Sequence, residues 1–187
     1  MGVTLTCAFA EWSPRLGDNH PMGWFTVLVY LVSALASARV ALTTASDRRE
    51  RVFWWGAALL LGFLAVNKQL DLQSLMTAIG RCHARLNGWY DVRGRVQLAF
   101  IVGATVVCLI GLITIAVVFR RHFVRLWPAF LGLAFVSAFV LARASSFHHV
   151  DTLIGTRLLG LRMNWLLELP GPILVLGVAV QRLRHAG

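Results

Sequence analysis

Long apolar stretches alternate with short polar segments along the chain, and their lengths predict helices that cross a membrane. A helix needs roughly 20 apolar residues to span a hydrocarbon layer about 30 Å thick. The stretch from Val96 to Phe119 meets this requirement and is interrupted only by Gln97, Thr105 and Thr114. We predict five spans, at about residues 23–42, 52–70, 97–119, 124–142 and 163–181.

The segment at about 71–88 has a different pattern, because its apolar residues recur at helical spacing while arginines occupy another face. Leu72 and Ile79 belong to the apolar stripe, and Arg81 and Arg85 belong to the polar face. Amphipathic helices of this kind lie in the headgroup layer. We predict an interfacial helix here, which either forms a lid in contact with lipid or simply packs against headgroups.

Together these patterns predict an all-α integral membrane protein, with a bundle of about five transmembrane helices and one interfacial amphipathic helix in a single domain over residues 1–187. Lipid cannot hydrogen-bond to the backbone, and the apolar runs do not alternate as the strands of a membrane barrel would. The residues before Gly23 are polar and predict no span.

Composition and charge strengthen this assignment. Hydrophobic residues make up 58% of the chain and charged residues only 14%, whereas a soluble domain is about 25% charged. The formal net charge of +10 comes from arginines clustered beside apolar runs. This is the pattern of membrane-flanking charge, so we expect no nucleic-acid partner. The preference for arginine over lysine favours a GC-rich genome, and we expect a bacterial inner membrane.

Three short arginine-rich segments predict the orientation. Residues 43–51, 120–125 and 181–185 fall on one side of a five-span bundle. Short basic loops stay in the cytoplasm. We therefore expect a periplasmic N-terminus and a cytoplasmic C-terminus.

The cysteines suggest no further constraint. Cys7, Cys82 and Cys108 have no metal-binding spacing. An odd, scattered set argues against a disulfide framework, and we expect buried or interfacial thiols.

Polar groups gather where several predicted spans reach the same membrane face. Lys68, the only lysine, ends the second span, and Glu168 lies inside the fifth. A charge at such depth costs about 2–3 kcal/mol even on lenient scales, so we expect these groups to face the bundle. Lys68 either extends to the headgroups or pairs with Glu168 or Asp71 in a buried site. On one continuous helix, Asn67, Lys68 and Asp71 would share a face.

The stretch RASSFHHVD, between the fourth and fifth spans, is the densest in potential chemistry. On a helix, Asp151 could orient His148, whereas His149 would point about 100° away. Two imidazoles, together with the carboxylates of Asp71 and Glu168, could bind zinc or iron. The competing interpretation is a hydrogen-bonded helix end with histidines among the headgroups.

The fifth span is broken by Pro170, Gly171 and Pro172 just after Glu168. Proline removes a backbone donor and interrupts the helical hydrogen bonds. The functional interpretation is a broken helix whose freed carbonyls and Glu168 line a polar cavity. The alternative is an ordinary proline kink.

The motifs AVNKQLDLQ (65–73), RASSFHHVD (143–151) and MNWLLEL (163–169) together resemble a family of small bacterial multi-spanning proteins, some labelled isopropylmalate isomerase. The enzyme of that name is a soluble iron–sulfur protein with three cluster-binding cysteines. This composition does not match it, so the resemblance implies membrane placement and little chemistry. SSFHHVD is also similar to the Ser…Phe-His pattern of ceramidase-like membrane hydrolases, in which a serine, histidines and an aspartate surround zinc. Those hydrolases have seven spans and a later HxxxH pair, which this sequence lacks.

Two hypotheses follow. The first is an enzyme that acts on a lipid or another amphiphile at the polar face. Its acid–base groups would be Asp71, His148, Asp151 and Glu168. Its metal ligands, if it binds one, would be His148, His149, Asp71 and Glu168. Its substrate-binding groups would be Asn67, Lys68, Arg143, Arg162 and Asn164. The alternative is a non-catalytic accessory subunit that contacts a quinone, pigment or haem in a larger membrane complex.

Overall fold

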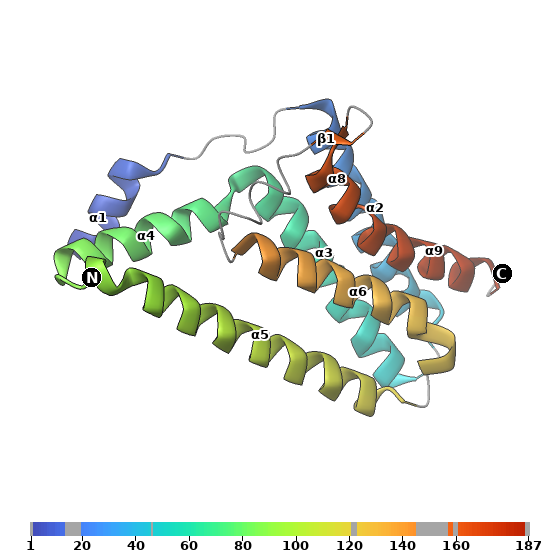
Figure 1. Ribbon diagram of the computed structural model, residues 1–187. Helices are drawn as coiled ribbons and strands as arrows, with labels where there is room; N and C mark the ends of the chain where they lie inside the picture. The colour runs from blue at the N-terminus through green and yellow to red at the C-terminus, as the bar shows by residue number, and fades with distance from the viewer. Residues whose placement is uncertain are drawn as a thin grey trace.

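A computed structural model describes residues 2–13, 20–45, 47–120, 123–144, 157–158 and 161–185, and these residues are almost entirely helical (Figure 1). The helices are α1 (Gly2–Glu11), α2 (Pro21–Thr43), α3 (Arg48–Leu70), α4 (Leu72–Leu86), the 3-10 turn η1 (Tyr90–Val92), α5 (Arg93–Val118), α6 (Phe123–Ala144), α8 (Met163–Glu168) and α9 (Pro170–Arg184). The two-residue strands β1 (Arg157–Leu158) and β2 (Leu161–Arg162) pair antiparallel just before α8.

Four helical segments in the described part of the chain are long and apolar enough to cross a membrane. They are Pro21–Thr43, Gly94–Val118, Arg125–Arg143 and Met163–Arg184. They coincide with the first, third, fourth and fifth predicted spans, which confirms an all-helical protein with four candidate membrane-spanning helices among the described residues. Helix α3, which contains two tryptophans and ends in the polar sequence NKQ, is not among the four.

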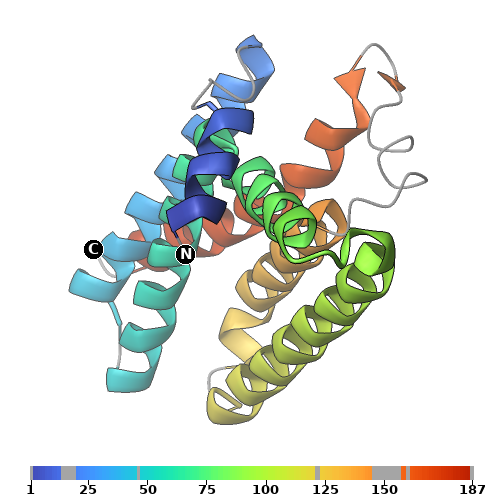
Figure 2. The same cartoon turned by 90° about the vertical axis from the view of Figure 1, so that its left-hand side faces the viewer.

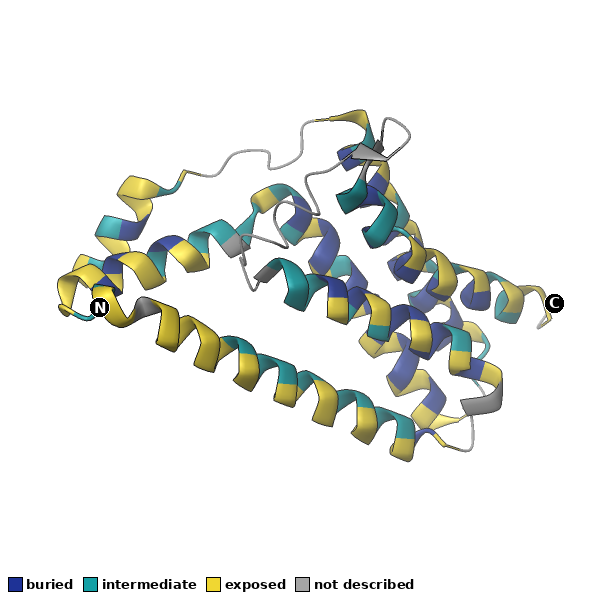
Figure 3. Cartoon of the chain, in the orientation of Figure 1, coloured by how far each residue is buried: buried dark blue, intermediate teal, exposed yellow. Residues whose placement is uncertain are grey.

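The core lies where α2 packs along α3 and α9, and where α6 packs along α9. Tyr30, Trp54, Leu61, Leu126 and Val175 are among its fully buried side chains. Figure 3 shows the buried positions concentrated on these helices. The same colouring shows α5 as exposed or intermediate along its length. In its most apolar window no residue is buried, against 39–50% in the other three candidate spans.

The Pro-Gly-Pro break has a packing reason. A Cβ atom on Gly132 of α6 would lie 2.6 Å from the carbonyl oxygen of Gly171, and a Cβ on Gly171 would lie 2.8 Å from that of Gly132. Only glycine lets the two backbones come so close, as is common where membrane helices cross. The break between α8 and α9 therefore stands beside a tight crossing with α6.

Asp71 separates α3 from α4, and here one prediction is wrong. Its backbone is left-handed, with φ 47° and ψ 50°, a conformation that aspartate tolerates better than most residues. Its N–H still donates to the carbonyl of Asn67 at 2.9 Å. Because α3 ends there, Asp71 does not continue the helical face of Asn67 and Lys68. The amphipathic segment starts afresh as α4.

The N-terminal residues differ from the prediction in two ways. They form α1, whereas the sequence predicted only a polar lead-in. Cys7 of α1 and Cys82 of α4 form a disulfide, so the expectation of free thiols is wrong for this pair. The two cysteines lie 75 residues apart in sequence, and only the packing of α1 on α4 brings them together. Cys108 is a free thiol, as expected.

Candidate functional site

The only lysine of the chain forms a buried ion pair. Nζ of Lys68, in the last turn of α3, lies 2.6 Å from Oε2 of Glu168, the last residue of α8. The two side chains are 3% and 5% exposed. The ammonium group is thus turned into the bundle, which supports pairing with Glu168 over extension to the headgroups.

Tyr30 of α2 is a third member of this cluster. Its buried hydroxyl donates a hydrogen bond to Glu168. The carboxylate therefore receives donors from two helices, α2 and α3. Arg143, near the end of α6, lies close enough to Tyr30 for an electrostatic interaction. We call Lys68, Glu168 and Tyr30 the Lys68–Glu168 cluster.

Sequence reasoning missed Tyr30, although a signal was present. Thr26, Tyr30, Ser33 and Ser37 recur at helical spacing in an otherwise apolar span, and all four are buried. Polar residues in one stripe of a membrane helix normally face its neighbours. The Ser33 hydroxyl lies 3.0 Å from the Pro172 carbonyl oxygen, to which it donates. The same hydroxyl lies 2.7 Å from the Val29 carbonyl oxygen of its own helix, so Ser33 is the member of the stripe that links α2 to α9 next to the helix break.

The prolines also free backbone acceptors beside the ion pair. In a continuous helix, the carbonyls of Leu166 and Glu168 would accept from the N–H groups of residues 170 and 172. Both positions are proline, which has no N–H. This local geometry adds acceptors at the same end of α8 as the carboxylate.

Two side-chain amides near the cluster in sequence have buried polar atoms without a partner among the described residues. They are Oδ1 of Asn164, one helical turn before Glu168, and both amide atoms of Gln69, next to Lys68. Buried polar atoms normally have partners, and exceptions need an explanation. At the start of α2, the His20 ring stacks on that of Trp165, with centroids 4.8 Å apart.

The structure brings together only some of the predicted site residues. Lys68, Glu168 and, through Tyr30, Arg143 belong to one cluster, and Asn164 lies on the same short helix as Glu168. The backbone carbonyl of Asn67 accepts a hydrogen bond from the backbone N–H of Asp71, and Asp71 forms the left-handed turn between α3 and α4. Arg162 lies in β2, where it is paired with Arg157. His148, His149 and Asp151 lie outside the described residues.

A metal site does not emerge from the described ligands. Within the described ranges, the one group of three close ligand atoms consists of Cys7, Glu11 and Cys82, and its two sulfurs are joined as a disulfide. Glu168 is already occupied by the lysine and tyrosine donors.

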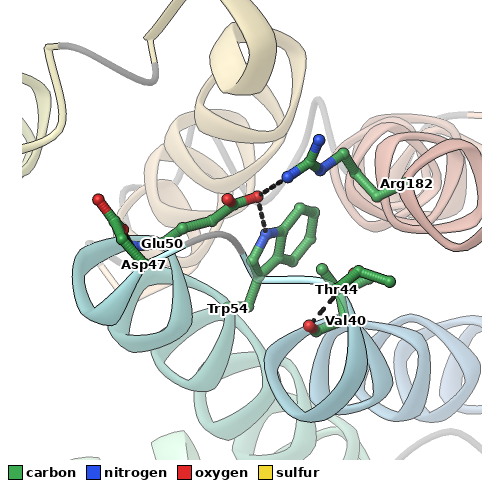
Figure 4. A network of polar contacts seen from close by, with 6 residues as sticks. All are labelled: Val40, Thr44, Asp47, Glu50, Trp54 and Arg182. Atoms are coloured by element: carbon green, nitrogen blue, oxygen red, sulfur yellow. Dashed lines mark hydrogen bonds and ion pairs between the residues drawn. The ribbon is translucent and has the colours of Figure 1, made fainter. Parts of the chain in front are cut away.

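A second buried ion pair, also absent from the prediction, lies at the other end of α3 (Figure 4). Arg182 of α9 donates to Oε1 of Glu50, which also accepts from Nε1 of Trp54 at 3.4 Å. Asp47 caps α3 by accepting the N–H of Glu50 at 2.8 Å. The spacing Asp47–Glu50 is that of a capping box, and this signal predicts the helix start but not the partner of Glu50.

No family model, curated protein or solved structure matches this chain. Function is therefore inferred from the residues and their geometry.

Proposed function

We propose that this chain is a bacterial inner-membrane enzyme that acts on a lipid or another amphiphile at the Lys68–Glu168 cluster. One observation carries the proposal. A buried ion pair is a poor way to stabilise a bundle, because an apolar pair of similar volume is commonly as stable or more stable. Retaining both charges where apolar side chains would serve favours a role in binding or chemistry.

The cluster contains the groups that such chemistry needs. Glu168 is a carboxylate that can accept a proton. The hydroxyl of Tyr30 donates a hydrogen bond to the same carboxylate and could supply a proton. Lys68 and Arg143 supply positive charge for a phosphate headgroup or a developing oxyanion. Asn164 and Gln69 have unpartnered amide atoms within the described residues and can hydrogen-bond to a polar headgroup. The apolar tails would lie among the helices.

The remaining predicted roles stay part of the proposal. His148, Asp151 and Asp71 would share the acid–base roles with Glu168, and Arg162 would bind substrate. The set His148, His149, Asp71 and Glu168 would suit zinc or iron. Because Glu168 already has two donors, the acid–base roles proposed here do not require a metal.

The proposal includes a fifth span and an orientation. Helix α3 has 23 residues, as many as α2, and packs along it, which supports α3 as a span whose charged ends are neutralised inside the bundle. Helix α4 would then be the interfacial helix. The arginine-rich segments 43–51, 120–125 and 181–185 would face the cytoplasm. The Lys68–Glu168 cluster would lie towards the periplasm.

Lipid conversion by the purified full-length chain in nanodiscs made from its host's extracted lipids tests the proposal. Mass spectrometry should detect a lipid product that forms over time with the wild type and not with Glu168→Gln. The control is the Glu50→Gln variant, which alters the other ion pair and should retain activity. Absence of any lipid change with folded wild-type protein would contradict the enzyme.

The second candidate is the accessory subunit, which the exposure of α5 favours. A span with no buried residue in its most apolar window has a whole surface for lipid or for a partner subunit that binds a quinone, pigment or haem. Native purification distinguishes the two. A partner at fixed stoichiometry that protects Cys108 of α5 from alkylation supports a subunit, and an active chain without partners supports the enzyme.

A further inference from the structure

Helices α1 and α4 form a cross-linked pair that stands apart from the core. Figures 1 and 2 both show α1 beside α4. Besides the Cys7–Cys82 disulfide, the Trp12 indole N–H donates to the Ser74 hydroxyl at 3.0 Å. We call α1 and α4, with these contacts, the α1–α4 hairpin, although α2 and α3 lie between the two helices in the sequence.

Two further contacts close this pair. Arg85 of α4 forms an ion pair with Glu11 of α1, which neutralises the only charged side chain of α1. Ala8 and Ala78 are buried between the helices beside the disulfide. Covalent, ionic and apolar contacts therefore join α1 to α4, and the disulfide and the buried alanines are the contacts that solvent does not weaken.

The hairpin still exposes large apolar side chains. On α1 they are Val3, Leu5 and Phe9, and on α4 they are Met76 and Leu86. Phe9 is 56% exposed and Met76 is 63% exposed. Leu5 and Phe9 are four residues apart and lie on one face of α1, and adjacent exposed apolar side chains of this kind mark contact sites. A partner is therefore needed, and the membrane is adjacent.

The position of the hairpin in the chain identifies the partner as lipid. Helix α4 is separated from α3 by Asp71 alone and from α5 by a short turn containing η1. Helix α5 is a candidate membrane span and α3 is the proposed fifth one, so α4 lies where they meet the membrane face. Half-buried Trp12 and Trp89 are typical of headgroup depth. Arg85 lies 5.4 Å from the centroid of the Tyr90 ring and is half exposed, so a lipid phosphate can reach it.

The disulfide indicates which leaflet is involved. Disulfides persist in oxidising compartments and are rare in the cytosol. The Cys7–Cys82 bond therefore favours the non-cytoplasmic side for the hairpin. Arginine-rich segments at the opposite helix ends favour the same orientation by an independent criterion.

We propose that the α1–α4 hairpin is a disulfide-clasped amphipathic platform that lies in the anionic headgroup layer of the leaflet facing the oxidising compartment. Leu5 and Phe9 of α1 enter the upper acyl region together with Met76 of α4. The disulfide keeps α1 in this layer. The platform does not include the Lys68–Glu168 cluster, so it stands or fails independently of the enzyme.

Photo-crosslinking tests the lipid contact. Full-length protein with p-benzoylphenylalanine in place of Phe9 is placed in nanodiscs of phosphatidylglycerol and phosphatidylethanolamine and irradiated. The matched control carries the same probe in place of Arg81, which lies opposite the apolar stripe of α4. We expect at least several-fold more acyl-chain adduct from the Phe9 site. Equal adduct at both sites, or adduct mainly to protein, would overturn the proposal.

Thiol accessibility tests the leaflet. Right-side-out vesicles are treated with a membrane-impermeant phosphine and then with an impermeant maleimide of defined mass. We expect two added masses after reduction and none before, because Cys108 lies within a span. The Cys7→Ser/Cys82→Ser variant should gain none. Labelling that requires permeabilised vesicles, or that occurs without the phosphine, would refute this placement.

Discussion

The two ends of α3 carry buried ion pairs with opposite polarity, and the comparison separates a structural pair from a candidate site. At the start of α3, Glu50 pairs with Arg182 in the last turn of α9. At its end, Lys68 pairs with Glu168. In the first pair, an acidic residue lies at a helix N-terminus and a basic residue at a helix C-terminus, where helix dipoles favour both.

The Lys68–Glu168 pair follows this rule only at the lysine. Glu168 ends α8 and directly precedes Leu169, the N-cap of α9, so the dipoles of the two helices act on its charge in opposite directions. It is held instead by two side-chain donors, Lys68 and Tyr30. Arg182 also remains 22% exposed, whereas both partners of the other pair are nearly inaccessible. Helix-end electrostatics therefore explain the Glu50–Arg182 pair, while the Lys68–Glu168 pair calls for another reason to exist.

The largest expected effect comes from breaking the Lys68–Glu168 pair on one side. Glu168→Leu leaves the buried ammonium group of Lys68 without its carboxylate partner, and we expect a loss of about 3–5 kcal/mol in the free energy of unfolding. Equilibrium unfolding in mixed detergent micelles measures it. The double variant Lys68→Met/Glu168→Leu should return to wild-type stability or exceed it. A double variant as unstable as the single one would show that the pair itself holds the bundle together.

Removing the tyrosine donor should have the next largest effect. Tyr30→Phe keeps the ring but deletes a hydrogen bond to a charged acceptor, which is worth about 1.5–3 kcal/mol. We expect that loss in the same unfolding measurement. In the double variant without the ion pair, the substitution should cost little, because no carboxylate remains. An equal cost in both backgrounds would mean that the hydroxyl acts elsewhere.

The Glu50–Arg182 pair should respond less strongly than its counterpart. Arg182→Met leaves Glu50 without its cation, but water reaches this end of α3 through the space left by a partly exposed guanidinium group. We expect a loss of about 1–3 kcal/mol. Added salt should reduce the difference between wild type and variant. A loss as large as that of Glu168→Leu would remove the distinction between the two pairs.

The smallest effect concerns the cap beside Glu50. Asp47→Ala removes the acceptor for the N–H of Glu50 and should cost about 1 kcal/mol, as for other N-caps. Asp47→Asn retains an acceptor and should cost much less. Comparing the two variants by thermal unfolding shows whether the cap hydrogen bond of Asp47 stabilises this end of α3. Equal losses would point to the charge of Asp47 instead.

Depth and length made part of this structure predictable. The apolar run lengths located four candidate spans within a few residues, because lipid imposes a fixed thickness. The second predicted span, residues 52–70, is helical but is not among the four. The cost of charge at depth predicted that Lys68 and Glu168 face the bundle. The partner of Lys68 was not predictable. Asp71 is three residues away and would be an equally good partner on a continuous helix, and only its left-handed backbone, which ends α3, excludes it.

The contacts that the sequence did not predict are mainly those between elements far apart in the chain. The Cys7–Cys82 disulfide depends on how α1 packs on α4, and α1, with ten residues, is too short to be recognised as a span. The pairing of Glu50 with Arg182 depends on the antiparallel course of α3 and α9. Neither is visible in local spacing. Tyr30 is the exception, since the stripe that contains it could have been recognised from sequence.

Asp71, the left-handed residue between α3 and α4, links the length of α3 to the direction in which α4 faces. Each residue added to an α-helix rotates the next segment of the chain by about 100° and advances it by about 1.5 Å. With only Asp71 between the two helices, a residue inserted into α3 would turn α4 by that angle about the axis of α3. No longer loop is present there to absorb the rotation, so the length of α3 sets the direction in which the apolar stripe of α4 points.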